Sequence, residues 1–344
     1  MRLIDGSQGE GGGSVLRIAT ALALVNQEAV TIENIRKKRP VSGLRPQHLL
    51  GLRALTDLCG GELVGGKIGS ESITFHPGSE WKSNLSVNIP TAGSIGLILQ
   101  VFQVGMLASA DHRVTISFQG GGTFGKWAPT VDYIQNVTWQ IFKQMNYHLE
   151  LSVNQHGFFP KGGAEVTVSM NSPSKLTGVN LTQGEELKNT TISSIATTHL
   201  KNARVAERQA EEIQHNLAEH DIDATTNISI SDAKNPGSGV LVYSTTGNAI
   251  IAGDAVGEKR RSAEMVGQTA FQNYFSTLSN QCSVDKFLAD QVLPVMALAS
   301  SSSTFTTPIL TKHTRTNINL IENLTGAKIS IEKFDKKFQL SVDV

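Results

Sequence analysis

One order of secondary-structure elements recurs along this chain, and it limits the folds that the chain can adopt. Alternating apolar residues indicate strands, and apolar residues three or four positions apart indicate helices. The order strand, helix, strand, helix, strand, strand is predicted twice, in units of roughly 80 residues. Its elements are expected at 1–5, 13–26, 29–35, 46–59, 61–66 and 71–76, and again at 83–89, 93–108, 112–118, 129–145, 147–152 and 164–170. Two helices per four strands favour units that stack both helices on one face of a sheet.

A third unit begins near Leu176 and is interrupted. It resumes with helices near 284–300 and 313–324 and with strands at 303–306, 327–332 and 337–342. The interrupting segment has its own pattern, with helices over 203–219 and after 257–268 and strands at 190–198, 224–230 and 239–245.

The whole pattern predicts an α/β (α+β) fold with two domains. Residues 1–183 and 281–344 are expected to form a large domain of three repeated β-α-β-α-β-β units. Residues 184–280 are expected to form a small inserted α/β domain, because surface loops of a host domain tolerate such insertions.

Charge and composition exclude several classes of protein. The 344 residues carry 30 Lys and Arg against 30 Asp and Glu, so a polybasic nucleic-acid coat is excluded, although a local basic patch is not. Two cysteines, Cys59 and Cys282, cannot form a disulfide framework or a cysteine-rich zinc site. No apolar run reaches the ~20 residues of a membrane span, and the N-terminus lacks the apolar core of a signal peptide. We expect a soluble, cytoplasmic protein without a membrane partner; the oligomeric state is left open.

A glycine-rich loop at 9–13 joins the first predicted strand to the first helix. Such a junction lets backbone N–H groups approach an anion at the helix N-terminus, but it also occurs as a simple tight turn. Glu10 lies within this loop, where a carboxylate needs a metal ion or a basic partner beside any bound anion. Arg17, one helical turn further on, is placed to reach the same ligand.

A second glycine-rich segment, GGGTFGKW at 120–127, has the glycine and lysine spacing of a P-loop. Trp127 occupies the position of the magnesium-binding Ser or Thr, and Pro129 follows. We therefore exclude a P-loop NTPase and retain only a glycine-rich connection.

A run of basic residues begins at Arg36 and includes His48. No acidic residue interrupts it, so it is either a solvated loop or a site for phosphate or a nucleic-acid backbone. Because Arg36 and Arg39 directly follow a strand, they are expected at the same end of the sheet as the glycine-rich loop. The basic members are Arg36, Lys37, Lys38, Arg39, Arg45 and Arg53.

His313 lies at the predicted start of a late helix. A helix N-terminus disfavours the imidazolium form, and a neutral imidazole is the form that can attack phosphorus. Taken alone, a structural histidine remains the ordinary interpretation, but the sequence shows no motif of a rival chemistry.

Taken together, these motifs resemble the RNA 3′-terminal phosphate cyclases, in order along essentially the whole chain. The similar blocks are DGSQGEGGGSVLR (5–17), IRKKRPVSGLRPQHL (35–49), HGFFPKGGAEV (156–166), VGEKRRSAE (256–264), FLADQVLPVMAL (287–298) and TKHTRTNINLIE (311–322). The resemblance implies three repeated units with a small inserted domain.

The resemblance also implies an activity. An RNA 3′-phosphate end would become a 2′,3′-cyclic phosphate at the expense of ATP, through a histidine–AMP and an RNA-(3′)pp(5′)A intermediate. The implied partners are ATP and RNA with a 3′-phosphate end, together with Mg²⁺ or Mn²⁺.

By matching position, the resemblance implies a role for each site residue. His313 would be the nucleophile that carries AMP, and Glu10 would hold the divalent metal. Arg17, Arg36, Arg39 and His48 would hold phosphates. Gln100, Pro129, Phe287, Asp290 and Gln291 would belong to the nucleotide pocket, where Phe287 replaces a frequent Tyr.

Two alternatives belong to other classes. Some relatives are non-catalytic ribosome-assembly proteins that bind RNA and lack the nucleophilic histidine, which is present here. A metabolic transferase built from similar units, such as an enolpyruvyl transferase, would not need the basic run.

Overall fold

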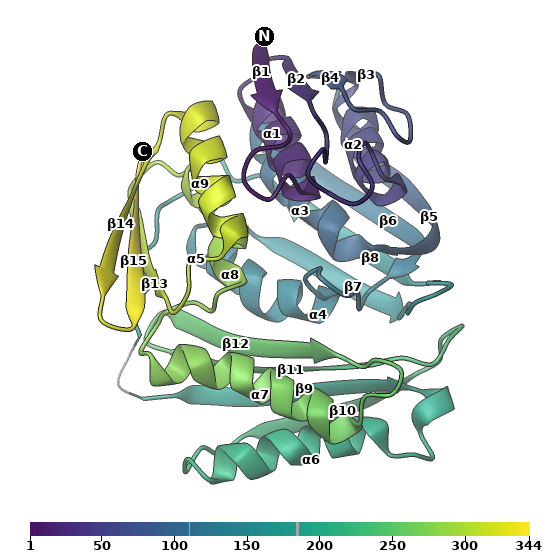
Figure 1. The fold of residues 1–344 in the computed structure, drawn as a ribbon, viewed down its shortest axis with the longest axis vertical. Coiled ribbons are helices and arrows are strands. Elements are labelled where there is room, and N and C mark those ends of the chain that lie inside the picture. The colour runs from purple at the N-terminus through teal and green to yellow at the C-terminus, as the bar shows by residue number, and fades with distance from the viewer. Residues whose placement is uncertain (110, 184–185) are drawn as a thin grey trace.

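The computed structural model describes residues 1–109, 111–183 and 186–344. It is a mixed α/β (α+β) structure in which four sheets surround and support packed helices, as predicted (Figure 1). The first sheet has the order β1-β2-β4-β3 and the second β5-β6-β8-β7. In both, the first two strands of the order are parallel and the others antiparallel. The two sheets therefore share one topology.

The elements of the first unit follow the predicted order. They are β1 (Arg2–Asp5), α1 (Gly13–Val25), β2 (Val30–Glu33), α2 (Pro46–Cys59), β3 (Glu62–Val64) and β4 (Ile73–His76). Pro46 opens α2, and Gly60 ends it in the left-handed conformation with φ 65°.

The second unit contains one departure from the prediction. Its elements are β5 (Asn84–Ser94), α3 (Ile95–Gly105), η1 (Met106–Ala108), β6 (Arg113–Gly122), α4 (Val131–Tyr133), η2 (Ile134–Thr138), α5 (Trp139–Gln144), β7 (Leu149–Gln155) and β8 (Glu165–Asn171). The single helix expected at 129–145 is thus interrupted by the π-helical turn η2. Hydrophobic periodicity does not reveal a change in helical hydrogen bonding, because one inserted residue barely shifts the apolar stripe.

The third unit has a three-stranded sheet in the order β13-β15-β14. Its elements are α8 (Leu288–Met296), β13 (Ser303–Thr307), α9 (Lys312–Thr325), β14 (Lys328–Phe334) and β15 (Lys337–Asp343). Where the other units have a first strand, Asn180 forms an isolated parallel bridge with Thr304. Helix α8 begins later than predicted because the Asp285 carboxylate accepts the N–H groups of Phe287 and Leu288.

The segment between these parts of the third unit folds around its own sheet, in the order β10-β9-β11-β12 (Figure 1). Its elements are β9 (Lys188–Thr197), η3 (Thr198–Leu200), α6 (Val205–Ala218), β10 (Thr225–Ser231), β11 (Ser238–Thr246), β12 (Ala249–Val256) and α7 (Ala263–Ser279). The sequence pattern missed β12, which returns antiparallel to β11 through Gly247. A separate cluster of buried side chains, including Ile213, Val242 and Tyr274, lies beneath α6 and α7.

The predicted domain boundaries at 184 and 280 stay a prediction. The first of them falls at residues 184–185, which lie outside the described residues.

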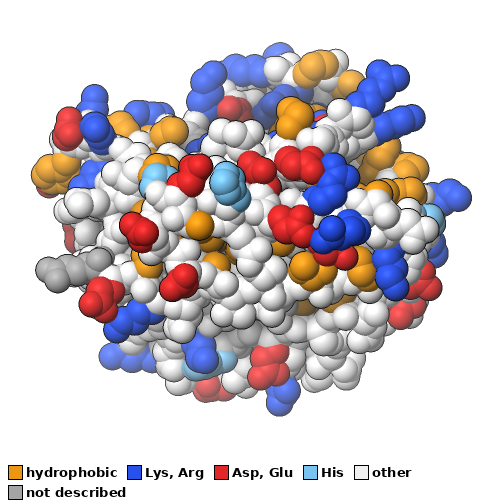
Figure 2. All heavy atoms as spheres, turned by 90° about the horizontal axis from the view of Figure 1, so that it is seen from below, with side chains coloured by type: hydrophobic (Ala, Val, Ile, Leu, Met, Phe, Trp, Pro, Cys, Tyr) orange, Lys and Arg blue, Asp and Glu red, His pale blue; other side chains and the backbone are white. Residues whose placement is uncertain are grey.

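On the face that Figure 2 shows, acidic and basic side chains are interspersed. In the described part of the chain, no helix is both long enough and apolar enough to span a bilayer.

The helices α1, α3, α8 and α9 pack against one another (Figure 1). They lie at the centre of the sheets of the first, second and third units (Figure 1). Helix α1 is apolar around most of its circumference, and Leu16, Leu22 and Leu24 are fully buried. Truncating one such Leu to Ala costs about 2–5 kcal/mol. The close packing of these four helices holds the side chains near their N-terminal ends in fixed positions.

Candidate functional site

The glycine-rich loop between β1 and α1 is tightly enclosed by residues from distant parts of the chain. A Cβ on Gly9 would lie 1.9 Å from Oγ1 of Thr316, and one on Gly13 would lie 2.1 Å from Cε1 of His48. Gly9 also has a φ of 55°, in the left-handed region. Only glycine lets the loop pass this close to α9 and α2.

His313, Glu10 and Arg39 meet at this loop. Nε2 of His313 lies 2.9 Å from Oε2 of Glu10, and Nη2 of Arg39 donates to the same oxygen at 3.2 Å. The His313 side chain is 46% exposed, so its ring stays accessible to a ligand. A carboxylate inside the loop is therefore balanced by a guanidinium, the basic partner that the sequence argument required.

The position and protonation of His313 follow from the start of α9. Thr311 caps this helix by accepting the N–H of Thr314, which places His313 in the first turn. Burial lowers the pKa of His313 below its ordinary value of 6.5; Glu10 opposes this effect, and the cations Arg17 and Arg39 add to it. The helix N-terminus also disfavours imidazolium. The ring is thus neutral at neutral pH.

His48 is a buried neighbour of the loop. Its side chain packs against Gly13, and among the described residues its Nδ1 has no hydrogen-bond partner. Burial, followed by the nearby Arg17, Arg36 and Arg45, lowers the pKa of His48 to about 3. A buried nitrogen without a partner is costly, so a donor or acceptor supplied by a ligand would be favoured here.

Arg17 and the acidic end of α8 line a narrow cavity of about 20 Å³. Nε of Arg17 donates to Oε1 of Gln100 at 3.1 Å, and Asp290 and Gln291 complete the opposite wall. Such a volume holds about one water molecule. The cavity is therefore lined both by Arg17, a predicted phosphate-binding residue, and by three predicted nucleotide-pocket residues, Gln100, Asp290 and Gln291.

Burial perturbs the two charged groups of this cavity. It raises the pKa of Asp290 to about 7 and lowers the pKa of Arg17 to about 10. Each group partly offsets the other's shift by its opposite charge. The pair is a partly desolvated carboxyl–guanidinium pair, a common arrangement where a polar ligand enters.

Three predicted residues lie outside these contacts. Arg36 donates to the carbonyl oxygen of Val41 at 3.4 Å, and its Nε has no partner among the described residues. The carbonyl oxygen of Pro129 lies against Gly96, at the start of α3. Phe287 is 45% exposed, with Nζ of Lys286 4.8 Å from its ring centroid.

Sequence reasoning missed two residues that join the parts of the site. Oγ of Ser14 donates to Oδ1 of Asn317 at 2.6 Å, and both side chains are buried. Nδ2 of Asn317 reaches the backbone oxygen of Asp290 at 3.4 Å. Asn317 lies four residues after His313, and this helical spacing is the sequence signal that could have identified it.

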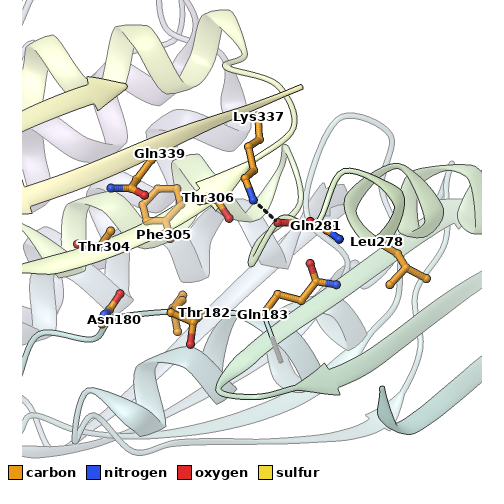
Figure 3. Close-up of a pocket in the computed structure, with 11 residues that line it drawn as sticks. Asn180, Thr182, Gln183, Leu278, Gln281, Thr304, Phe305, Thr306, Lys337 and Gln339 are labelled. Carbon is orange, nitrogen blue, oxygen red and sulfur yellow. Dashed lines mark hydrogen bonds between the residues drawn. The ribbon is translucent and has the colours of Figure 1, made fainter. Parts of the chain in front are cut away.

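A larger cavity lies elsewhere and contains none of the predicted residues. It has a volume of about 540 Å³ between the third sheet and the end of α7 (Figure 3). Thr304, Thr306, Gln339 and other polar side chains line it, and Lys337 donates to the Gln281 carbonyl at 3.1 Å (Figure 3). Size alone therefore does not identify the site; the chemistry gathered at the glycine-rich loop does.

The acidic groups allow a limited test for a metal ion. Among the described residues, no cluster of three or more His, Cys, Asp or Glu side chains could hold one. Magnesium often binds through one or two carboxylates together with substrate phosphates. Glu10 fits that role as a single ligand beside a bound triphosphate.

Comparisons with known proteins identify the family of this chain. The family model for RNA 3′-terminal phosphate cyclase matches residues 8–331. An RNA 3′-terminal phosphate cyclase of Archaeoglobus fulgidus is 37% identical over 96% of this chain and 97% of its own. The cyclase of Methanothermobacter thermautotrophicus is 36% identical over 96% of this chain and 96% of its own length. That of Pyrococcus abyssi is 37% identical over 96% of this chain and 95% of its own length. The chain belongs to the RNA 3′-terminal phosphate cyclase family.

Family membership confirms the identification made from the motifs, and the protein is an enzyme of this cyclase family. The enolpyruvyl transferase NikO from Streptomyces tendae aligns with 98% of this chain and 47% of its own, with a TM-score of 0.41 and 11% sequence identity. The roles of the individual site residues remain predictions.

Proposed function

We propose that this enzyme uses ATP to convert an RNA 3′-phosphate end to a 2′,3′-cyclic phosphate in the cytoplasm. The observation that carries the proposal is the contact of a half-exposed, neutral His313 with Glu10 inside a glycine-rich loop. Relatives named RNA 3′-terminal phosphate cyclase support the cyclase function. The mechanism is the one that the family resemblance implies, and the contact of His313 with Glu10 supports it.

The first step forms a covalent protein–nucleotide bond. A ring nitrogen of His313 attacks the α-phosphorus of ATP; a P–N bond forms, the bond from the α-phosphorus to the bridging oxygen breaks, and pyrophosphate leaves. A terminal phosphate oxygen of the RNA then attacks the same phosphorus and releases His313. Finally the neighbouring 2′-hydroxyl attacks the RNA phosphorus, loses its proton and expels AMP, which closes the ring.

Nε2 of His313 is the nitrogen that faces Glu10. A carboxylate at 2.9 Å favours the tautomer that carries a proton on Nε2, whereas attack by Nε2 requires its lone pair to be free. Glu10 must therefore leave Nε2 as the proton moves to Nδ1. Arg39, already bonded to Glu10, can hold the carboxylate in a displaced position.

The surrounding groups would bind the two substrates. Arg17, Arg36, Arg39 and His48 are proposed to hold phosphates, because guanidinium groups and an unpartnered buried nitrogen favour phosphate oxygens. The nucleotide would lie against Gln100, Asp290 and Gln291, which line one cavity, and against Pro129 and Phe287 outside it. The exposed ring of Phe287 offers a face on which adenine can stack.

Mg²⁺ or Mn²⁺ held by Glu10 and the triphosphate would neutralise the charge that develops on pyrophosphate. Arg39 pairs with the same carboxylate, so it would have to turn toward the phosphates for Glu10 to take a cation. Departure of Glu10 from His313 toward a cation would also free the nucleophile.

Labelling with α-³²P-ATP and magnesium tests the proposal. The protein should retain acid-labile label, His313→Ala should lose it, and His215→Ala, which changes a fully separate exposed histidine, should keep it. Substantial label on His313→Ala would contradict the nucleophile assignment. A folded, RNA-binding protein that never takes up label would favour the non-catalytic assembly role.

A further inference from the structure

The two glycine-rich segments at 120–127 and 156–164 lie side by side, although the proposed chemistry uses neither. The N–H of Thr123 donates to the oxygen of Gly157 at 3.0 Å, and that of Gly120 to the oxygen of Ala164 at 2.7 Å. Oγ1 of Thr123 also contacts Nδ1 of His156 at 3.1 Å. We call these two segments the paired loops.

The base of the paired loops is firmly anchored. Phe124 and Phe158 stack with ring centroids 5.4 Å apart and an angle of 7°, and both are buried. A Cβ on Gly237 would lie 2.2 Å from Phe158, and one on Gly239 would lie 2.4 Å from Phe124. Close packing against the inserted segment therefore leaves the loop bases little freedom to move.

The tips of the same loops point two aromatic rings into solvent. Trp127 is 93% exposed and Phe159 is 81% exposed, the highest values among aromatic side chains in the described residues. Trp127 has a φ of 58°, a conformation that bulky residues rarely adopt. Exposed rings on an anchored base are suited to binding, because a packing role would bury them.

Basic side chains accompany these rings. Lys126, Lys161, Lys234, Lys259 and Arg260 are exposed on the paired loops and on the adjoining loops after β10 and β12. Nζ of Lys126 lies 5.3 Å from the Trp127 ring centroid. Glu258 pairs with Lys126 at 2.6 Å and offsets the charge of that lysine, and Asp232 accepts the Thr198 hydroxyl.

A bridge of surface residues connects the paired loops to the nucleotide site. A Cβ on Gly162 would lie 2.6 Å from the oxygen of Thr91, and one on Gly93 would lie 4.0 Å from Cβ of Gln47. Thr91 and Gln47 are exposed, and Gln47 directly precedes His48 in α2. Exposed residues therefore lie between Gln47, the neighbour of the buried His48, and the paired loops.

We propose that Trp127 and Phe159 form a stacking platform for RNA nucleotides on the 5′ side of the reacting 3′-phosphate end. Aromatic rings interleaved with lysines bind single-stranded RNA by stacking and by contact with phosphates, largely without regard to sequence. This inference rests on the proposed function, since it extends the RNA substrate from the same site. If the exposed rings bind a partner protein instead, the KM of Trp127→Ala should not depend on RNA length.

The test compares two 3′-phosphorylated RNAs, a dinucleotide and a ten-nucleotide single strand, with the intact protein. Trp127→Ala and Phe159→Ala should each raise the KM for the longer RNA about 10-fold and leave that for the dinucleotide unchanged. Trp127→Phe should restore most of the affinity, because it keeps a stacking face. Phe334→Ala is the matched control, because Phe334 is also an exposed aromatic next to a lysine, Lys333, but lies on the β14–β15 hairpin and not on the paired loops.

Unchanged KM for the longer RNA, or equal losses with both RNAs, overturns the platform. Labelling by α-³²P-ATP is measured on the same variants without RNA and should equal that of the parent protein. Fluorescence anisotropy of the labelled ten-nucleotide RNA, without ATP, separates the two proposals. If the parent protein takes up no label yet Trp127→Ala still weakens this binding about 10-fold, the cyclase mechanism fails and the platform stands.

Discussion

Nε2 of His313 lies 2.9 Å from Oε2 of Glu10, which joins the first turn of α9 to the loop before α1. This contact holds the ring, favours a proton on Nε2 and stabilises the imidazolium form. In the proposed reaction the first two effects must be reversed, because attack needs a free Nε2. Burial already outweighs the third effect and keeps the ring neutral. In the proposed mechanism Glu10 would thus hold the nucleophile inactive until a nucleotide arrives.

Glu10→Gln should shift the pH dependence of self-adenylation to lower pH. The rate of labelling rises as His313 loses its proton, and its pKa already lies below 6.5 because of burial. Removing the negative charge of Glu10 removes an effect that raises this pKa, so the midpoint should fall further. Single-turnover labelling between pH 4.5 and 8 measures it. A midpoint that moves upward would contradict this electrostatic role.

Arg39→Ala should lower kcat/KM for ATP or RNA by about 10–100-fold while the fold stays intact, because a charge-assisted hydrogen-bond donor is lost. Lys37→Ala is the matched control from the same basic run, since Lys37 contacts Asn34 instead of Glu10. Steady-state kinetics with both substrates measure the effect. Parent-like constants for ATP and RNA would remove Arg39 from the site.

Gly13→Ala should impair labelling at least about 10-fold and destabilise the protein by about 1–3 kcal/mol. The new Cβ would lie 2.1 Å from Cε1 of His48, so the buried ring must move. Gly51→Ala in α2 is the control: its Cβ meets ordinary contacts at 3.6 Å, and alanine favours the helix by up to about 1 kcal/mol. Urea unfolding and labelling rates test both; a Gly13→Ala protein equal to the parent in both assays would refute the packing argument.

His48→Gln should make the protein less sensitive to acid. The folded-state pKa of His48 is about 3, below the 6.5 of an unfolded histidine. Between pH 7 and pH 5 the unfolded chain gains a proton there and the folded chain does not, so stability falls by about 2 kcal/mol. The variant should lack this loss. The other titratable groups change the unfolding free energy equally in parent and variant, so their effect cancels when the two are compared. Urea unfolding at the two pH values measures the difference; equal losses in parent and variant would show that His48 is not buried in its neutral form.

The sequence predicted most of the fold because apolar periodicity and local caps act over short distances. The paired strand and helix patterns located nearly all elements of the first two units, and the helix predicted at 313–324 matches α9 (Lys312–Thr325). It missed β12, whose continuous apolar run follows β11 so closely that periodicity alone did not separate them. It also missed the π-helical turn within 129–145, because that turn leaves the side-chain pattern almost unchanged.

The sequence by itself determined the family and the types of residue that could act on phosphates, since motif order and side-chain chemistry are properties of the chain. Only the tertiary structure decided that Glu10 faces His313, that His48 packs on Gly13, and that Asn317 joins Ser14 to Asp290. The contacts of Glu10 with His313 and of Ser14 with Asn317 link residues from opposite ends of the chain. They arise because the packing of α1, α8 and α9 buries their apolar faces together, and no local pattern encodes that arrangement.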